Sequence, residues 1–346
     1  MGDELGPDPW ERPEDAELAA GLCRWLTHQR GLADPVVHNL SRPSAGYSSE
    51  TLVVEVSWSD GDGRHRGSLV ARMAPPTVGT FADYDLVAQC QAQMAVADVG
   101  VPVADPDLET DTSWVGAPFI VMPKLEGHIV GALAHRDRWL AGLEPERRGR
   151  IYDDFLSTLA RIHRADPVAA TAVARRDNGA GLDFWEEYLS WSTGGRPVPA
   201  LAAALAWCRK HRPADEPASA LLWGDVRLEN AVLDDDGKLL AVLDWDMTSV
   251  GAPEHDLAWL TSLDLTMHRL FGTRTEGFPD RERTVSRFEE LSGRPVRDLE
   301  WYETLAMVRS TAVMTRISVL RRDAGEPLIL PIEDNPILDI LTARLT

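Results

Sequence analysis

Residues 221–246 read Leu-Leu-Trp-Gly-Asp-Val-Arg-Leu-Glu-Asn-Ala-Val-Leu-Asp-Asp-Asp-Gly-Lys-Leu-Leu-Ala-Val-Leu-Asp-Trp-Asp, and this stretch decides the fold. Two short apolar runs, 231–233 and 239–243, flank the pair Asp236-Gly237. Apolar runs around Asp-Gly are typical of a β-hairpin, because the tight turn needs a positive φ that glycine adopts without strain. We therefore expect a short hairpin with polar residues at its two open ends.

Three polar residues at these open ends have the types and spacing that phosphoryl transfer needs. Asp225 and Asn230 stand five residues apart before the hairpin, and Asp244 follows it. In the protein-kinase pattern, the catalytic aspartate and a metal-binding asparagine have this spacing, and a second metal-binding aspartate comes later. Carboxylate and amide oxygens suit Mg²⁺, and a carboxylate can orient an attacking hydroxyl. The spacing favours a functional site over three unrelated loop residues.

A wider set of motifs resembles one known family. Trp223-Gly224-Asp225 stands where the aminoglycoside phosphotransferase (choline-kinase-like) family has His-Gly-Asp, and residues 251–258 resemble its Gly-x-Pro-x-x-Asp-Leu-Ala segment. With tryptophan in the first position, the motif resembles that of a narrower group, the actinobacterial phosphotransferase family proteins. These proteins are related to the kinase-like domain of some acyl-CoA dehydrogenases. The tryptophan removes a polar residue beside the catalytic loop, so we expect Trp223 to pack. The resemblance covers most of the chain.

The resemblance implies an α+β, protein-kinase-like fold with two lobes, and 346 residues exceed the usual size of one domain. We expect a small β-rich N-lobe over residues 1–122, which binds the nucleotide phosphates. A larger, mainly helical C-lobe over residues 123–346 would hold the catalytic loop, the metal ligands and the acceptor pocket. Where the lobes meet, an apolar strand resembles the one whose backbone binds adenine in family members. Val121 and Met122 are therefore the expected neighbours of the base.

Phosphate contacts are expected in the N-lobe. A predicted strand carries Arg72 where the family has a Lys or Arg that holds phosphates, and Ser48-Ser49 lie in a turn similar to the family's Gly-x-Ser-Asn-x-Thr loop. A solvated cation and an ordinary hairpin turn are the alternatives. Kinases pair this cation with a glutamate on the next helix, which we expect over residues 81–96. The matching position is Val87, so the ion pair is in doubt.

Composition narrows the class of protein. The chain has 35 Lys and Arg against 55 Asp and Glu, a net charge of −20, which opposes binding to nucleic-acid phosphates. No run approaches the ~18 apolar residues of a membrane span, and the acidic N-terminus lacks the features of a signal peptide. The three cysteines have no metal-like spacing and predict reduced thiols. We expect a cytoplasmic protein that binds neither nucleic acid nor membrane.

Other residues have both structural and functional interpretations. His163 follows an apolar helical stripe and is expected to pack or donate a hydrogen bond rather than catalyse. The aromatic residues of segment 183–192 are expected in the core rather than as a stacking platform. Asp256 is expected to have a structural role near a helix N-terminus. Arg309 and Arg316 lie seven apart on one helical face, and we expect solvated side chains, with contact to an acidic substrate as the alternative.

These patterns predict Mg²⁺-dependent transfer of the γ-phosphoryl group of ATP, with GTP as the alternative donor, to a hydroxyl of a small molecule. Asp225 would orient or deprotonate that hydroxyl, and Arg227 would neutralise charge beside it. Asn230 and Asp244 would hold the metal, with Asp246 as an outer ligand. These roles follow the kinase pattern of residue types and spacing.

Two other classes remain open at this point. A nucleotide-binding, pseudokinase-like protein without catalysis is motivated by Val87 and Trp223, which depart from the family's pattern. A metal-dependent hydrolase could use the same acids, although the sequence has no His-rich ligand set for it. The acceptor could be an aminoglycoside, a choline-like alcohol, a sugar or a hydroxyacyl thioester, because fold does not determine substrate. The sequence leaves the oligomeric state open.

Overall fold

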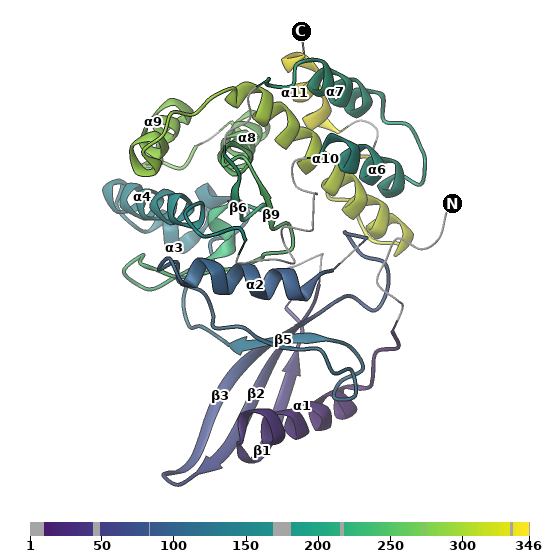
Figure 1. The fold of residues 1–346 in the computed structure, drawn as a ribbon, viewed down its shortest axis with the longest axis vertical. Coiled ribbons are helices and arrows are strands. Elements are labelled where there is room, and N and C mark those ends of the chain that lie inside the picture. The colour runs from purple at the N-terminus through teal and green to yellow at the C-terminus, as the bar shows by residue number, and fades with distance from the viewer. Residues whose placement is uncertain are drawn as a thin grey trace. The chain divides into compact units, whose positions relative to one another are not determined.

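The fold is described here from a computed structural model of the chain. The structure describes residues 10–43, 49–82, 84–168, 181–214, 218–272, 274–332 and 335–345. The chain divides into two compact units, the first formed by Met1–Met94 with Ala104–Leu125 and the second by Ala95–Val103 with Glu126–Thr346 (Figure 1). Among the described residues, no helix is long and apolar enough to cross a membrane.

The first unit is an antiparallel sheet with a helix packed on it. In chain order its elements are α1 (Asp15–Arg30), β1 (Ala33–Ser41), β2 (Glu50–Asp60), β3 (Gly63–Met73), β4 (Asp107–Glu109) and β5 (Phe119–Pro123), and the strand order is β1-β2-β3-β5-β4. Side chains alternate along β2, so that Leu52, Val54 and Val56 point into the core. Leu22 and Trp25 of α1 belong to the same buried cluster, which fixes the helix on the sheet.

Helix α2 (Leu86–Ala97) is shorter than the sequence predicts. The expectation of a helix from residue 81 is wrong, because the backbone before Leu86 is not helical where it is described. The reason is a local hydrogen bond: the Asp85 carboxylate accepts from the Ala88 N–H at 2.8 Å. An aspartate in this position satisfies a donor of the first helical turn, so the helix begins just after it.

The second unit is mainly helical. Its helices are η1 (Ala134–Arg136), α3 (Arg138–Ala141), α4 (Pro145–Ile162), α6 (Leu182–Ser192), α7 (Pro199–Lys210), η2 (Leu228–Asn230), α8 (Glu254–Phe271), α9 (Arg281–Ser292), α10 (Leu299–Asp323) and α11 (Pro336–Arg344). Helix α10 packs against α6, α7, α8 and α11 (Figure 1). It is buried on nearly all sides over its first half, where Tyr302, Leu305 and Val308 are each at most 1% exposed.

Two short strand pairs lie in this helical unit. Strands β7 (Ala231–Leu233) and β8 (Leu239–Val242) pair antiparallel, and β6 (Ala220–Leu222) pairs with β9 (Ser249–Gly251). The predicted hairpin is therefore confirmed, and Gly237 in its turn has a φ of 81°. Only glycine adopts this left-handed conformation at little cost. The ends of these short strands position the residues before and after the hairpin.

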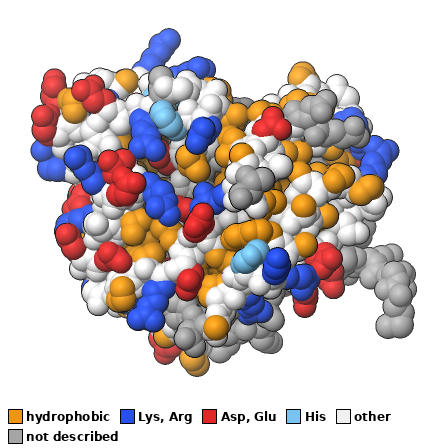
Figure 2. Space-filling model, turned by 90° about the horizontal axis from the view of Figure 1, so that it is seen from above, with side chains coloured by type: hydrophobic (Ala, Val, Ile, Leu, Met, Phe, Trp, Pro, Cys, Tyr) orange, Lys and Arg blue, Asp and Glu red, His pale blue; other side chains and the backbone are white. Residues whose placement is uncertain are grey.

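The predicted fold class is confirmed: an antiparallel sheet forms the N-terminal unit, and the C-terminal unit is mainly helical. On the face drawn in Figure 2, basic side chains lie among acidic and apolar ones. The excess of acidic residues therefore does not form one continuous negative patch on that face.

Candidate active site

The loop that carries Asp225 begins directly after β6. Trp223 and Gly224 follow the strand, and Gly224 has a φ of 94°. A Cβ atom at Gly224 would lie 2.2 Å from the carbonyl oxygen of Met247, which no side chain can tolerate. The glycine of this motif is therefore required both by its backbone conformation and by the close approach of the neighbouring segment.

Asp256, in the first turn of α8, holds this loop by its backbone. Its Oδ2 accepts from the Trp223 N–H at 2.8 Å, and its Oδ1 accepts from the Gly224 N–H at 2.9 Å. His163 Nε2 lies 3.0 Å from the same Oδ2, and both side chains are buried. The structural interpretation of Asp256 and the hydrogen-bonding interpretation of His163 are confirmed. Their network fixes the two residues that precede Asp225.

The carboxylate of Asp225 is hydrogen-bonded on both oxygens. Asn230 donates its Nδ2 to Asp225 Oδ2 at 2.9 Å and to the Asp225 carbonyl oxygen at 3.0 Å. Trp259 of α8 donates its indole N–H to Asp225 Oδ1 at 3.0 Å. Arg227 forms an ion pair with Oδ2, with its Nε 3.2 Å away. Asp225, Arg227 and Asn230, which the sequence predicts to act together, are thus adjacent in the structure.

The protonation of Asp225 reflects this environment. Burial and the nearby charge of Asp244 raise the pKa of Asp225, while Arg227, Asn230 and Trp259 oppose that rise. Burial also disfavours the charge on Arg227. The nearby carboxylates, of which Asp225 has the largest effect, nevertheless raise the pKa of its guanidinium. A carboxylate with a raised pKa is a stronger base than an ordinary aspartate, and such shifts are common at functional sites.

Asp244 follows β8 and is held in an unusual conformation. Its φ is 59°, in the left-handed region that residues other than glycine seldom adopt. The Trp223 indole N–H donates to the carbonyl oxygens of Leu243 and Asp244, at 2.9 and 3.2 Å. The Leu243 N–H donates to the Asn230 carbonyl oxygen at 2.8 Å, which ties the two ends of the hairpin together.

Trp223 therefore has a polar function as well as a packing one. It is 1% exposed and lies against Phe155 and Trp245, as expected for a packing residue. The sequence did not predict its second role, in which the indole N–H supplies a donor to the segment that carries Asp244. Strained conformations persist where surrounding contacts hold them, and they are concentrated at functional sites.

The oxygens at this site fit a hard divalent cation. Asn230 uses its amide nitrogen toward Asp225, which leaves its amide oxygen for a ligand, and the predicted second ligand, Asp244, lies on the segment tied to Asn230. Asp246 is 6% exposed, two residues further on. Among the described residues there is no group of three or more His, Cys, Asp or Glu side chains that could hold a metal. Mg²⁺ needs only one or two carboxylates when phosphates and water complete its shell.

The predicted nucleotide contacts belong to the first unit. Arg72 of β3 donates to the Ser49 hydroxyl from Nη2 at 3.0 Å and from Nε at 3.3 Å, so these two residues are brought together. Val121 and Met122 lie on β5 and are buried. Ser48 lies outside the residues that the structure describes. Phosphate and adenine binding by this group stay predictions.

Two residues near Asp225 were missed or not preferred as functional candidates in the sequence. Trp259 was not singled out, although its indole N–H reaches Asp225. Arg309 was expected to be solvated, but it is 1% exposed, and its Cζ lies 5.1 Å from the centroid of the Trp259 ring. The expectation for Arg309 is therefore wrong. An available signal was its position: apolar residues and threonines surround it in α10, which is unusual for an exposed cation.

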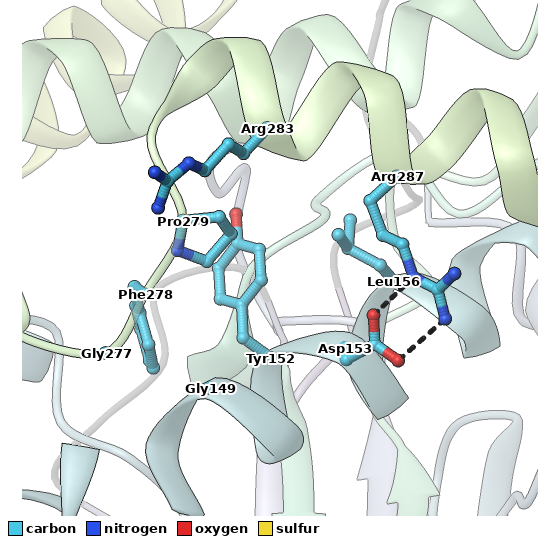
Figure 3. A pocket seen from close by; sticks show the side chains of 9 residues that line it. All are labelled: Gly149, Tyr152, Asp153, Leu156, Gly277, Phe278, Pro279, Arg283 and Arg287. Atoms are coloured by element: carbon cyan, nitrogen blue, oxygen red, sulfur yellow. Dashed lines mark hydrogen bonds and ion pairs between the residues drawn. The ribbon is translucent and has the colours of Figure 1, made fainter. Parts of the chain in front are cut away.

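A separate cavity lies between α4 and α9. Its volume is about 380 Å³, and it is lined by Gly149, Tyr152, Asp153, Leu156, Gly277, Phe278, Pro279, Arg283 and Arg287 (Figure 3). The Arg287 guanidinium donates to both carboxylate oxygens of Asp153, at 2.6 and 3.0 Å. Its charge is thereby neutralised within the wall, and none of the predicted site residues lines this cavity.

Comparison with known proteins identifies the family. The family model described as the phosphotransferase enzyme family matches residues 39–279 of the 346. The chain therefore belongs to the phosphotransferase enzyme family. This confirms the resemblance, and the match gives no support to the alternative of a protein that binds nucleotides without catalysis.

Curated relatives are acyl-CoA dehydrogenase family proteins. Human acyl-CoA dehydrogenase family member 11 is 29% identical over 232 residues, which cover 63% of this chain and 29% of that protein. The probable acyl-CoA dehydrogenase IBR3 of Arabidopsis thaliana is 26% identical over 309 residues, which cover 82% of this chain and 36% of that protein. The chain thus spans well under half the length of the curated relatives it matches.

Solved structures share the fold. A protein from Ralstonia eutropha JMP134 assigned to the aminoglycoside phosphotransferases has a TM-score of 0.68 at 21% identity, over 94% of this chain and 97% of that chain. A macrolide 2′-phosphotransferase from Brachybacterium faecium has a TM-score of 0.53 at 19% identity, over the same shares. A thermostable aminoglycoside phosphotransferase mutant, in complex with AMP-PNP and hygromycin B, has a TM-score of 0.53 at 16% identity, over 94% of this chain and 96% of that chain. The expected kinase-like fold is confirmed.

Proposed function

We propose that this protein is a small-molecule kinase, which transfers the γ-phosphoryl group of ATP to a hydroxyl group in a Mg²⁺-dependent reaction. The observation that carries the proposal is the arrangement of Asp225. Asn230 donates a hydrogen bond to one carboxylate oxygen of Asp225, and Trp259 donates to the other. The Asn230 carbonyl oxygen also accepts a hydrogen bond from Leu243, which precedes Asp244. Phosphoryl transfer depends mainly on positioning and on electrostatic stabilisation, and this arrangement supplies positioning.

Asp225 acts on the acceptor in this proposal. The acceptor hydroxyl donates a hydrogen bond to the Asp225 carboxylate, which orients its oxygen toward the phosphorus atom and takes its proton as the new P–O bond forms. The raised pKa of Asp225 suits proton acceptance, because the carboxylate is then a better base. Arg227, at 3.2 Å from Asp225, offsets negative charge beside the carboxylate.

The remaining predicted residues bind the nucleotide and its metal. The Asn230 amide oxygen and the Asp244 carboxylate would hold Mg²⁺, with Asp246 as a further ligand. When bound, the ion neutralises phosphate charge and orients the γ-phosphoryl group. Arg72, with Ser48 and Ser49, contacts the phosphates. The strand that carries Val121 and Met122 contacts adenine through its backbone groups.

A nucleotide-binding experiment tests the proposal. We expect ATP with Mg²⁺ to raise the melting temperature of the wild type, because a ligand that binds only the folded state stabilises it. Asp244→Ala should lose the Mg²⁺-dependent part of this rise. Asp225→Asn should keep the rise and lose turnover by a factor of about 10² to 10⁴, the usual contribution of a general base.

Parallel measurements with GTP identify the preferred donor. ADP release with candidate hydroxyl compounds then searches for the acceptor. A wild type that responds to neither nucleotide, or an Asp225→Asn variant with normal turnover, would contradict the proposal.

A further inference from the structure

Arg309 is a buried cation that no described carboxylate neutralises by contact. Its side chain is 1% exposed in the first half of α10. Within the described part of the chain it forms no ion pair, and its Nε donor has no acceptor. Its Cζ instead lies over the Trp185 ring at 5.2 Å and over the Trp259 ring at 5.1 Å. Buried charges are normally paired, so an unpaired guanidinium requires a specific explanation.

One of these two rings connects Arg309 to the candidate catalytic residue. The Trp259 indole that Arg309 contacts also donates to Asp225 Oδ1 at 3.0 Å. Asn230 and Arg227, which belong to the metal side of the site, contact the other oxygen, Oδ2. The two oxygens thus face different surroundings. Arg309 lies one indole ring away from Oδ1, the oxygen that Asn230 does not contact.

The aromatic surroundings of Arg309 resemble a receptor for a cation. Tryptophan faces that meet around one position are the usual way to bind a ligand ammonium group. Here the chain's own guanidinium occupies that position. Contacts with ring faces stabilise the charge but use none of the five N–H donors of arginine. Those donors match the paired oxygens of a carboxylate or a phosphate.

Arg309 stays charged at neutral pH despite its burial. Burial lowers the pKa of Arg309 to about 10, while the charges of Asp256 and Asp225 oppose the fall. Its neighbour His255 does not add to the charge, because burial, followed by the charges of Arg309 and Arg212, lowers the pKa of His255 to about 3. Charges interact strongly where water is excluded, so a buried guanidinium acts on a nearby charged group even without direct contact.

We propose that Arg309 selects the acceptor by charge: the acceptor is a hydroxyl compound that also carries a carboxylate or phosphate group, and cationic alcohols are rejected. This inference rests on the proposed function, because it concerns the acceptor of the same site. It assigns Arg309 a role in specificity, while the reaction at Asp225 is unchanged.

Acceptors matched in size but different in charge test the inference. Glycerol, glycerate and glycerol 3-phosphate share a three-carbon hydroxyl skeleton, and choline supplies the cationic case. Each is titrated into the full chain with Mg²⁺ and AMP-PNP, and the shift in melting temperature is recorded. We expect at least about tenfold tighter apparent binding of one or both anions than of glycerol, the scale of a charge-assisted hydrogen bond, and no response to choline.

Variants of Arg309 and Arg316, the two arginines of α10 that stack on tryptophan rings, test whether the preference for anions comes from Arg309. Arg309→Met should abolish the preference for the anions while its response to Mg²⁺ and AMP-PNP remains. Arg316→Met is the matched control, since Arg316 lies on the same helix and stacks on Trp191 at 4.3 Å. It should keep the preference. Arg309→Lys retains the charge and should keep part of the preference for the anions. This variant replaces Arg309→Met in the test if the methionine variant does not fold.

Three outcomes would overturn the inference while leaving the proposed function intact, provided that the nucleotide response is present. They are equal binding of glycerol and both anions, a response to choline that matches theirs, and an anion preference that survives in Arg309→Met. Loss of the nucleotide response in the wild type would instead count against the proposed function itself. Comparison of glycerate with glycerol 3-phosphate identifies which oxyanion the site prefers.

Discussion

At the scale of single residues, the Asp225 carboxylate is shaped by two hydrogen bonds with different origins. Asn230 is a neighbour in the chain, whereas Trp259 comes from α8, 34 residues away. Each donor stabilises the ionised carboxylate, and together with Arg227 they limit the rise in pKa that burial produces. The basicity of Asp225 is therefore set by a balance that a single substitution can change.

Replacing Trp259 with phenylalanine should shift the pH dependence of activity. The substitution removes a donor to the charged carboxylate, so the pKa of Asp225 rises further. The base acts in its ionised form, so activity falls as the pH drops below this pKa. We expect the acidic limb of the profile of kcat/KM against pH to move to higher pH in the variant.

Trp245→Phe is a suitable control for this prediction, because Trp245 is also buried near the loop and donates to a backbone carbonyl instead. Its acidic limb should stay where it is in the wild type. A profile for Trp259→Phe that is only lowered, without any displacement along the pH axis, would show that the indole does not tune Asp225.

At the scale of elements, the first turn of α8 determines where the loop after β6 lies. Asp256 accepts the N–H groups of Trp223 and Gly224, and without it these buried donors have no acceptor. An unsatisfied buried donor costs about 1–3 kcal/mol. We expect Asp256→Ala to lower the free energy of unfolding by at least about 2 kcal/mol, measured by urea denaturation.

A second variant separates the hydrogen bonds from the bulk of the side chain. Asp256→Asn keeps one acceptor oxygen and the size of the side chain, so its loss of stability should be smaller than that of the alanine variant. Equal stability of the wild type and Asp256→Ala would mean that the loop is held by other contacts.

Glu303 of α10 joins the last helices of the chain. It accepts from Arg281 of α9 at 2.6 and 3.1 Å, from Thr261 of α8 at 2.8 Å, and from Arg344 of α11. Burial opposes its charge, but the hydrogen bonds from Arg281 and Thr261 and the charges of both arginines lower the pKa of Glu303 below its usual value. The side chain is 2% exposed, so this is a buried ionic network.

Glu303→Gln should destabilise the second unit and change its pH dependence. Breaking a buried ion pair on one side costs about 3–5 kcal/mol. Because the folded-state pKa is lowered, the stabilisation by Glu303 is present above the unfolded-state pKa and is lost as the pH falls through the folded-state value. The difference in melting temperature between wild type and variant should therefore shrink at acidic pH. A difference that is constant with pH would contradict this.

At the scale of the whole molecule, the net charge of −20 opposes compaction. The surface carries ion pairs of both signs, such as Arg42 with Asp15 and Arg287 with Asp153, but each exposed pair contributes little. We expect the melting temperature to rise as NaCl increases from about 10 to about 150 mM, since the Debye length falls from about 30 to about 8 Å. Sucrose at equal osmolarity controls for solvent effects. A fall with salt would show that attractive pairs outweigh the repulsion.

Much of the fold follows from local patterns in the sequence. The apolar helical stripe before His163, which runs from Ile151 to Ile162, and the hairpin around Gly237 are both present, because apolar periodicity and turn residues act over a few neighbouring positions. The start of α2 was missed, although Asp85 was an available signal for a helix N-terminus. The spacing of Asp225, Asn230 and Asp244 also identified the region of the candidate site.

The sequence by itself thus predicted the hairpin and the polar residues at its ends, because these depend on short-range spacing, and its resemblance to a known family implied the kinase-like fold. Only the tertiary structure decided what surrounds them. Asp256 and Trp259 reach the loop from α8, and Arg309 reaches Trp259 from α10. A side chain that bonds a backbone N–H, or a cation that lies over a ring, leaves no periodic signal. Such contacts depend on how helices far apart in the chain pack together.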